Sequence, residues 1–151
     1  MSQSETINLS KVFGARRDRY ATKQGDWILG ENIAIMGDVA SFWDWMRGLG
    51  GLQFRVMVRC LDGTVRDWIG RQGVYKSEQD GEVSGEGRPM ANRARHNLAF
   101  WTATHGSKAN TGTGKGNRTL KVSGIIAVRV NGQDYLPEIG VLELRAAGII
   151  N

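Results

Sequence analysis

Residues 120–137 read LKVSGIIAVRVNGQDYLP and predict a β-hairpin. Apolar residues recur at every second position of its first half, which is the period of a strand. Asn131-Gly132 is a favoured two-residue hairpin turn. The resulting register places Arg129 opposite Asp134, a favourable cross-strand pair. Pro137 lacks a backbone donor and is expected to end the return strand.

An earlier hairpin is expected at residues 53–69, where alternation again predicts a strand with one buried face. Asp62-Gly63 suits a two-residue turn. That register places Arg59 opposite Arg66, which is unfavourable. Two explanations stay open: a bulge, with Gly63 in a three-residue turn, or an anion held between the arginines. The bulge is the favoured explanation.

One helix is expected, at about residues 38–48. Asp38 occupies its N-cap position, and apolar residues from Val39 to Met46 recur at helical spacing. Trp45 lies off this apolar stripe, so it is either covered by a strand or available to a partner subunit. Short strands are expected at residues 7–13, 27–29, 33–36, 97–104 and 139–145.

These elements predict a mainly β fold: a small antiparallel β-barrel or sandwich with one short α-helix, long loops, and extended N- and C-terminal arms. The 151 residues are expected to form a single domain. Four segments are expected to lie outside its regular core. They are a basic N-terminal arm (1–25), an acidic loop (76–89), a Gly/Lys-rich loop (105–117) and an apolar tail (146–151).

The net charge of +5 is concentrated in residues 87–133, which contain no Asp or Glu. A positive surface this dense indicates an anionic partner, which is nucleic acid, a membrane surface or an acidic face of another protein. The candidate polyanion-binding residues are Arg88, Arg93, Arg95, Trp101, Lys108, Lys115, Arg118 and Lys121. The candidate subunit-interface residues are Trp45, Glu78, Asp80, Glu82, Glu86, Ile149 and Ile150.

Catalytic, metal-binding and cofactor-binding residues are not assigned. The loop around Gly114-Lys115 departs from a P-loop, because Ala109 replaces the first glycine and Gly116 replaces the Ser or Thr that holds magnesium. Cys60 falls on the apolar side of its strand, where a buried thiol is the common outcome. The chain is expected to need no cofactor and to have no enzymatic activity.

No secretory signal and no apolar run of membrane-spanning length is visible, so a virion or cytoplasmic location is expected without membrane insertion. The favoured function is a structural subunit that self-assembles into a ring, tube or shell with copies of itself and with other structural proteins. Its general style resembles small tail-tube, connector or decoration subunits of phage and virus particles, although no motif is shared. The alternative is a nucleic-acid-binding protein that uses residues 87–133.

Overall fold

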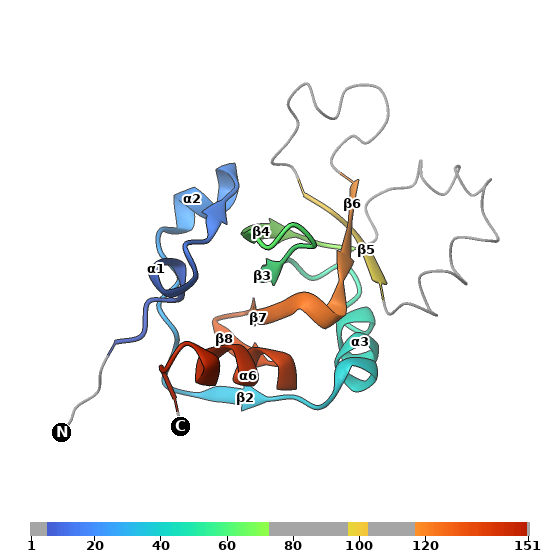
Figure 1. The fold of residues 1–151 in the computed structure, drawn as a ribbon. Coiled ribbons are helices and arrows are strands. Elements are labelled where there is room, and N and C mark those ends of the chain that lie inside the picture. Colours follow the sequence, from blue (N-terminus) through green and yellow to red (C-terminus); the bar gives the residue numbers. More distant parts are fainter. Residues whose placement is uncertain (1–5, 73–96, 103–116, 151) are drawn as a thin grey trace.

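The computed structural model describes residues 6–72, 97–102 and 117–150. A six-stranded sheet with strand order β1-β4-β3-β7-β8-β2 forms its centre, and β5 pairs with β6 in a separate two-stranded ribbon (Figure 1). The strands of the sheet are β1 (Arg16–Arg17), β2 (Ile33–Ile35), β3 (Phe54–Arg59), β4 (Val65–Gly70), β7 (Ile125–Val130) and β8 (Gln133–Leu136). The ribbon consists of β5 (Asn97–Trp101) and β6 (Asn117–Lys121).

Helices make up much of the rest of the described chain. They are α1 (Leu9–Phe13), α2 (Arg19–Gln24), α3 (Val39–Arg47) and α6 (Glu138–Ala146), with a short 3-10 helix η4 (Val122–Gly124). The sheet is mixed, because β1 pairs with β4 and β2 pairs with β8 in parallel. It does not close on itself. The prediction of a mainly β, antiparallel barrel or sandwich with one helix is therefore wrong; the fold is mixed α/β.

The N-terminal segment is folded onto the sheet, so the predictions of an extended arm and of a strand at residues 7–13 are wrong. Asn8 caps α1 by accepting from the backbone N–H of Lys11, and Asp18 caps α2 by accepting from Ala21. Gly14 ends α1 in the left-handed region at φ 58°. These capping residues form local helices because they satisfy otherwise free backbone donors.

The C-terminal segment is helical where the sequence predicted a strand at residues 139–145. Pro137 ends β8 as expected and also stands at the N-cap of α6, where its missing N–H costs no helical hydrogen bond. The predicted C-terminal arm is wrong as well, because Ile149 and Ile150 pack against buried residues of the same chain. A helix replaces the strand because residues 138–146 cover the inner strands β7 and β8.

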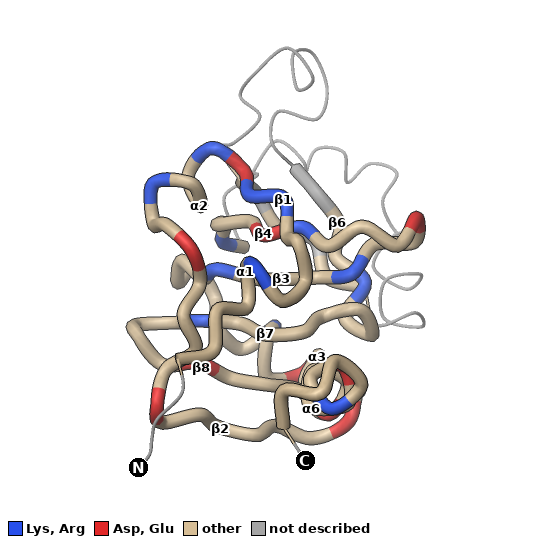
Figure 2. The backbone as a smooth tube through the Cα atoms, turned by 60° about the vertical axis from the view of Figure 1, so that its left-hand side comes forward, with Lys and Arg blue, Asp and Glu red and all other residues tan. Residues whose placement is uncertain are grey.

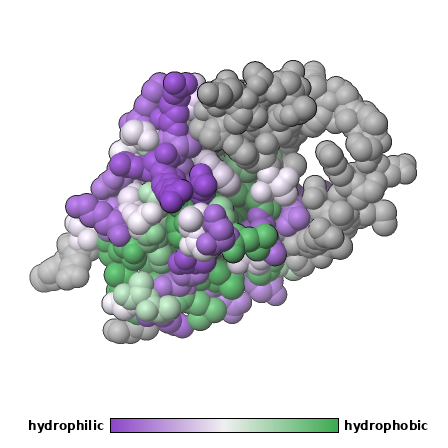
Figure 3. Space-filling view, turned by 45° about the horizontal axis from the view of Figure 1, so that its top comes forward, coloured by the Kyte–Doolittle hydropathy of each residue, from purple (hydrophilic) through white to green (hydrophobic). Residues whose placement is uncertain are grey.

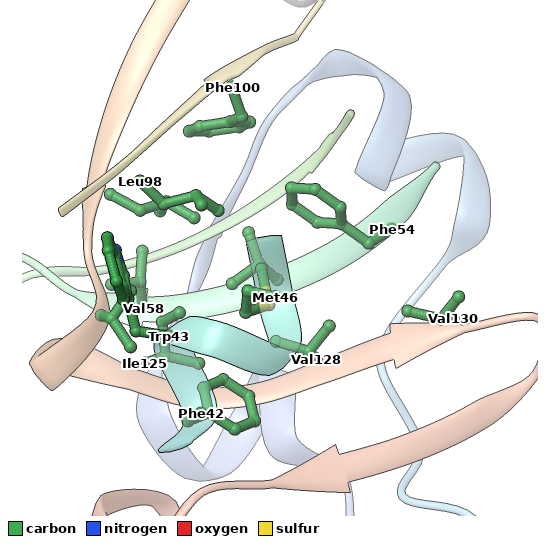
Figure 4. Close-up of a cluster of buried hydrophobic side chains, with 13 residues drawn as sticks. Phe42, Trp43, Met46, Phe54, Val58, Leu98, Phe100, Ile125, Val128 and Val130 are labelled. Carbon is green, nitrogen blue, oxygen red and sulfur yellow. The ribbon is translucent and has the colours of Figure 1, made fainter. Parts of the chain in front are cut away.

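Both faces of the sheet are covered. On one face, α3 and the β5–β6 ribbon pack on β3 and β7 around Phe42, Phe54 and Phe100 (Figure 4). On the other face, α6 and the N-terminal segment pack around Trp27, Met57 and Leu144. The prediction that β3 buries only one face is therefore wrong.

The turns follow the sequence closely. β7 pairs with β8 in the predicted register, with Arg129 opposite Asp134, and Asn131 and Gly132 both have positive φ. In the earlier hairpin the register is shifted by one residue, so Arg59 faces Val65. Cys60 and Thr64 close a three-residue turn with Gly63 at φ 90°, which confirms the favoured explanation. The helix predicted at 38–48 is present as α3.

The long strand predicted from residue 120 is divided into two. η4 turns the chain between β6 in the ribbon and β7 in the sheet. A bulge then shifts the β3–β7 register next to Met57 and Val58. As a result the consecutive residues Ile126 and Ala127 both face the α6 side.

Candidate assembly surfaces

The two outer strands of the sheet, β1 and β2, end it in different ways. β1 is two residues long and consists of Arg16 and Arg17, both exposed. A very short outer strand that carries only like charges discourages pairing with a second copy of itself. β2 is longer and apolar, and Ile35 at its end is 63% exposed. β2 carries no charged side chain, so it does not oppose pairing in this way.

The backbone N–H and C=O groups of Ile35 point away from the sheet. Met36 donates to the carbonyl of Leu136 at 2.7 Å, so Met36 and Ala34 direct their backbone groups toward β8. Alternation along the strand turns those of Ile33 and Ile35 away from the sheet. No strand within the described residues pairs with this side of β2. An additional strand could therefore bind here through main-chain hydrogen bonds.

The surface beside β2 combines apolar residues with carboxylates. A hollow of about 370 Å³ lies between Ile35, Met36 and α6, with Asp38 and Glu138 in its lining. Leu142, one helical turn beyond Glu138, is 51% exposed. We call Glu31, Ile35, Asp38, Glu138 and Leu142 the acidic edge.

The opposite end of the sheet carries exposed positive charge. We call the exposed residues Lys11, Arg16, Arg17, Arg19 and Lys23 the basic edge. Figure 2 shows Lys and Arg positions around β1 and α2, and Asp and Glu positions beside β2 at the other end of the sheet. Hydrophilic surface covers the α2 end of the molecule in Figure 3. Arg16 also lies beside Arg66 of β4, which adds to the positive charge.

The buried charges hold the N-terminal segment in place. Arg55 binds Asp67 through two hydrogen bonds of 3.0 and 2.8 Å, and it also donates to the carbonyl of Gly25. Burial raises the pKa of the Asp67 carboxyl, and the contact from Arg55 opposes that rise. Because this ion pair is engaged with the backbone of the N-terminal segment, we assign it a structural role.

A second buried group surrounds Asp134. Its carboxylate accepts from Arg129, from the indole N–H of Trp27 and from the backbone of Gly30. The guanidinium groups of Arg55 and Arg129 lie 5.0 and 5.3 Å from the centre of the Trp27 ring. Every polar atom of this carboxylate is thus engaged within the fold, and the group is structural too.

An open groove of about 560 Å³ separates the β3–β4 hairpin from the β5–β6 ribbon. Cys60, Trp68 and Lys121 are among its lining residues. Arg59 also lines it, but its guanidinium is held by Glu143 at 2.9 Å. That contact raises the pKa of Arg59. The groove offers an aromatic surface beside one lysine.

The predicted site residues are placed as follows. Trp45 lies part-buried with its ring 4.5 Å from that of Tyr135, so a strand covers it in part. Trp101 belongs to β5, and Arg118 and Lys121 belong to β6. The loops 76–89 and 105–117 lie almost wholly outside the described residues, apart from Asn117. So do Glu78, Asp80, Glu82, Glu86, Arg88, Arg93, Arg95, Lys108 and Lys115. For all of these the interface and polyanion-binding roles stay predictions.

The acidic edge was missed at the sequence level, although a signal exists. Residues 24–46 contain no Lys or Arg but include Asp26, Glu31, Asp38 and Asp44. A second base-free run, residues 130–144, contributes Glu138. Only the fold shows that residues 31–38 of the first run and Glu138 of the second lie at one end of the sheet.

No family model, curated protein or solved structure matches this chain. Within the described residues, no helix has the length and apolar character to cross a membrane. The same part of the chain contains no cluster of three or more His, Cys, Asp or Glu side chains placed to hold a metal ion.

Proposed function

We propose that this protein is a non-enzymatic structural subunit that self-assembles into a ring, tube or shell through the open edge at β2. The observation that carries the proposal is the outer side of β2, which pairs with no strand of the described residues and lies beside exposed Ile35. Unpaired backbone groups next to an exposed apolar side chain form a template for strand addition. At the other end of the sheet, the short, arginine-bearing β1 discourages pairing with a second β1.

The structural use of the buried charges supports this proposal. Asp67, Asp134 and their arginines are committed to holding the N-terminal segment on the sheet. Contact with other copies requires only a rigid sheet with an exposed edge strand.

The test measures mass by light scattering across a wide range of protein concentration. The wild-type chain is expected to gain mass with concentration. Ile35→Lys places a charge on the outer strand and is expected to remain monomeric. The matched control is Leu61→Lys, at the tip of the β3–β4 hairpin, where the side chain is 88% exposed. A wild-type chain that stays monomeric at every concentration would overturn the proposal.

Nucleic-acid binding is the second candidate function, and the groove beside Trp68 and Lys121 favours it. An aromatic ring beside a cation suits single-stranded nucleic acid, which binds by base stacking and phosphate contacts. Titration of a labelled single-stranded oligonucleotide at several salt concentrations tests this. Binding that weakens steeply with salt and is reduced in Lys121→Glu supports it. Absence of binding at low salt excludes it.

A further inference from the structure

We infer that the subunits assemble head to tail, with the acidic edge of one copy on the basic edge of the next. The inference rests on the proposed self-assembly and names the partner surface. Its first support is strand direction. β4, β3, β7 and β8 are successively antiparallel, while β1 runs parallel to β4 and β2 runs parallel to β8. β1 and β2 therefore run in opposite directions.

If a second copy is displaced sideways in the plane of the sheet, without rotation, its β1 lies antiparallel to β2 of the first copy. The antiparallel arrangement is the slightly more stable of the two ladder types. The faces also match, because the α3 side of one sheet continues into the α3 side of the next. Arg17 has its backbone groups turned outward, since Asp18 donates to Asp67 on β4 at 3.0 Å. It supplies the backbone partner for Ile35.

Charge is the second support. Residues 9–23 contain five cations, and their one acid, Asp18, is buried as a helix cap. The acidic edge is formed by the two base-free runs described above. Within the basic edge, Arg17 is partly neutralised by Asp26 at 3.0 Å, whereas Arg16, Arg19 and Lys23 are exposed. Unlike charges on the two edges attract and orient the copies.

Apolar surface is the third support. The hollow at the acidic edge has Ile35 and Val141 in its wall with two carboxylates. A hollow of about 230 Å³ beside α2 has Tyr20 and Ile69 in its wall, together with Lys23 and Arg71. Each hollow thus combines apolar residues with charges of one sign. Contact between unlike edges buries the apolar residues of both and brings opposite charges together at the rim.

The two symmetric alternatives bring like charges together. Antiparallel pairing of two β2 strands centred on Ile35 would place Asp38 of one copy beside Glu31 of the other. Pairing of two β1 strands would oppose arginines. A head-to-tail contact avoids both conflicts and leaves one acidic and one basic edge free at each stage. Such a contact closes into a ring or continues as a filament.

The test uses two variants, each blocked at one edge. The first carries Glu31→Lys and Ile35→Lys; the second carries Arg16→Ser, Arg19→Ser and Lys23→Ser. These side chains are all exposed, so far-UV circular dichroism is expected to match that of the wild-type chain. Each variant alone is expected to be monomeric. Their mixture is expected to give a heterodimer, because each variant keeps the edge that the other has lost. Lys121→Ser, which removes a positive charge from the ribbon, controls for net charge.

The outcomes separate this inference from the proposed function. A second variant that still forms dimers alone indicates symmetric pairing of β2 and overturns the head-to-tail inference while self-assembly stands. A mixture that remains monomeric, when the wild-type chain assembles, also overturns it. A monomeric wild-type chain overturns both. A mixture that forms a heterodimer, and no larger species, supports both the self-assembly and the head-to-tail contact.

Discussion

Burial of charge distinguishes two ion pairs that look alike in sequence. Arg55–Asp67 lies inside the fold, with side chains 6% and 0% exposed, whereas Arg59–Glu143 is partly open to water. A buried charge that loses its partner has neither water nor a counter-charge to stabilise it. The energetic consequences of breaking the two pairs should therefore differ.

We expect Asp67→Leu to lower the free energy of unfolding by about 3–5 kcal/mol, since it leaves the guanidinium of Arg55 buried without its carboxylate. Glu143→Leu is the matched control and should cost about 1 kcal/mol or less, because Arg59 remains hydrated. Urea unfolding curves of both variants measure the difference. Equal losses in the two variants would contradict the structural role of the buried pair.

Gly140 is required by a close approach of backbone to backbone. α6 crosses β7 so closely that a Cβ at this position would overlap the carbonyl of Ile126. Helix propensity alone predicts that Gly140→Ala stabilises the protein by up to about 1 kcal/mol. We expect the opposite, a loss of about 1–3 kcal/mol, because α6 must move away from the sheet.

Thermal unfolding of Gly140→Ala measures that loss. Gly48→Ala serves as the control, since it lies at the C-cap of α3 with φ −72° and the added Cβ would meet its nearest atom at 3.4 Å. Its effect should remain within about 0.5 kcal/mol. A stabilised Gly140→Ala variant would show that α6 does not pack on β7 this closely.

At the scale of elements, α2 depends on one side chain. It is six residues long, too short to persist by itself. The carboxylate of Asp18 accepts from Ala21 at 2.7 Å, from the backbone of Ile69 at 3.2 Å and from the hydroxyl of Thr102 at 3.3 Å. One residue thus caps the helix and joins it to β4 and to the end of β5.

We expect Asp18→Ala to increase hydrogen exchange in residues 19–24 more than in β3 or β7. The cap and two tertiary hydrogen bonds are lost together, so the free energy of unfolding should fall by about 2 kcal/mol. Asp38→Ala, which removes the cap of the longer α3, is the comparison. If exchange rose equally over the whole chain, Asp18 would not act on α2 in particular.

Elements with strong local signals were predictable. α3 has its cap, its apolar spacing and its terminal glycine within one short segment, and β7–β8 has Asn131-Gly132. α6 was mistaken for a strand because apolar Leu142 and Leu144 alternate with charged Glu143 and Arg145 as they would in a strand. Only its packing on β7 through Gly140 makes the segment helical.

At the scale of the molecule, exposed charges of opposite sign lie at the two ends of one sheet. Attraction between such edges is screened by salt, and the screening length falls from about 10 Å at 0.1 M to about 3 Å at 1 M. We therefore expect assembly to weaken as salt is raised, which sedimentation velocity at several salt concentrations measures. Ile35→Lys should remain monomeric throughout. Assembly that strengthens with salt would indicate an apolar contact instead.

The sequence by itself determined the local elements: the β7–β8 register, the three-residue turn at Gly63 and the helix that begins after Asp38. Each depends on residues that are near one another in the chain, so local preferences suffice. Tertiary structure alone decided that β1 and β2 are the outer strands, that both faces of β3 are covered and that acidic and basic surfaces lie at opposite ends. These features arise from contacts between distant segments, such as Trp27 with Asp134, whose pairing no local pattern specifies.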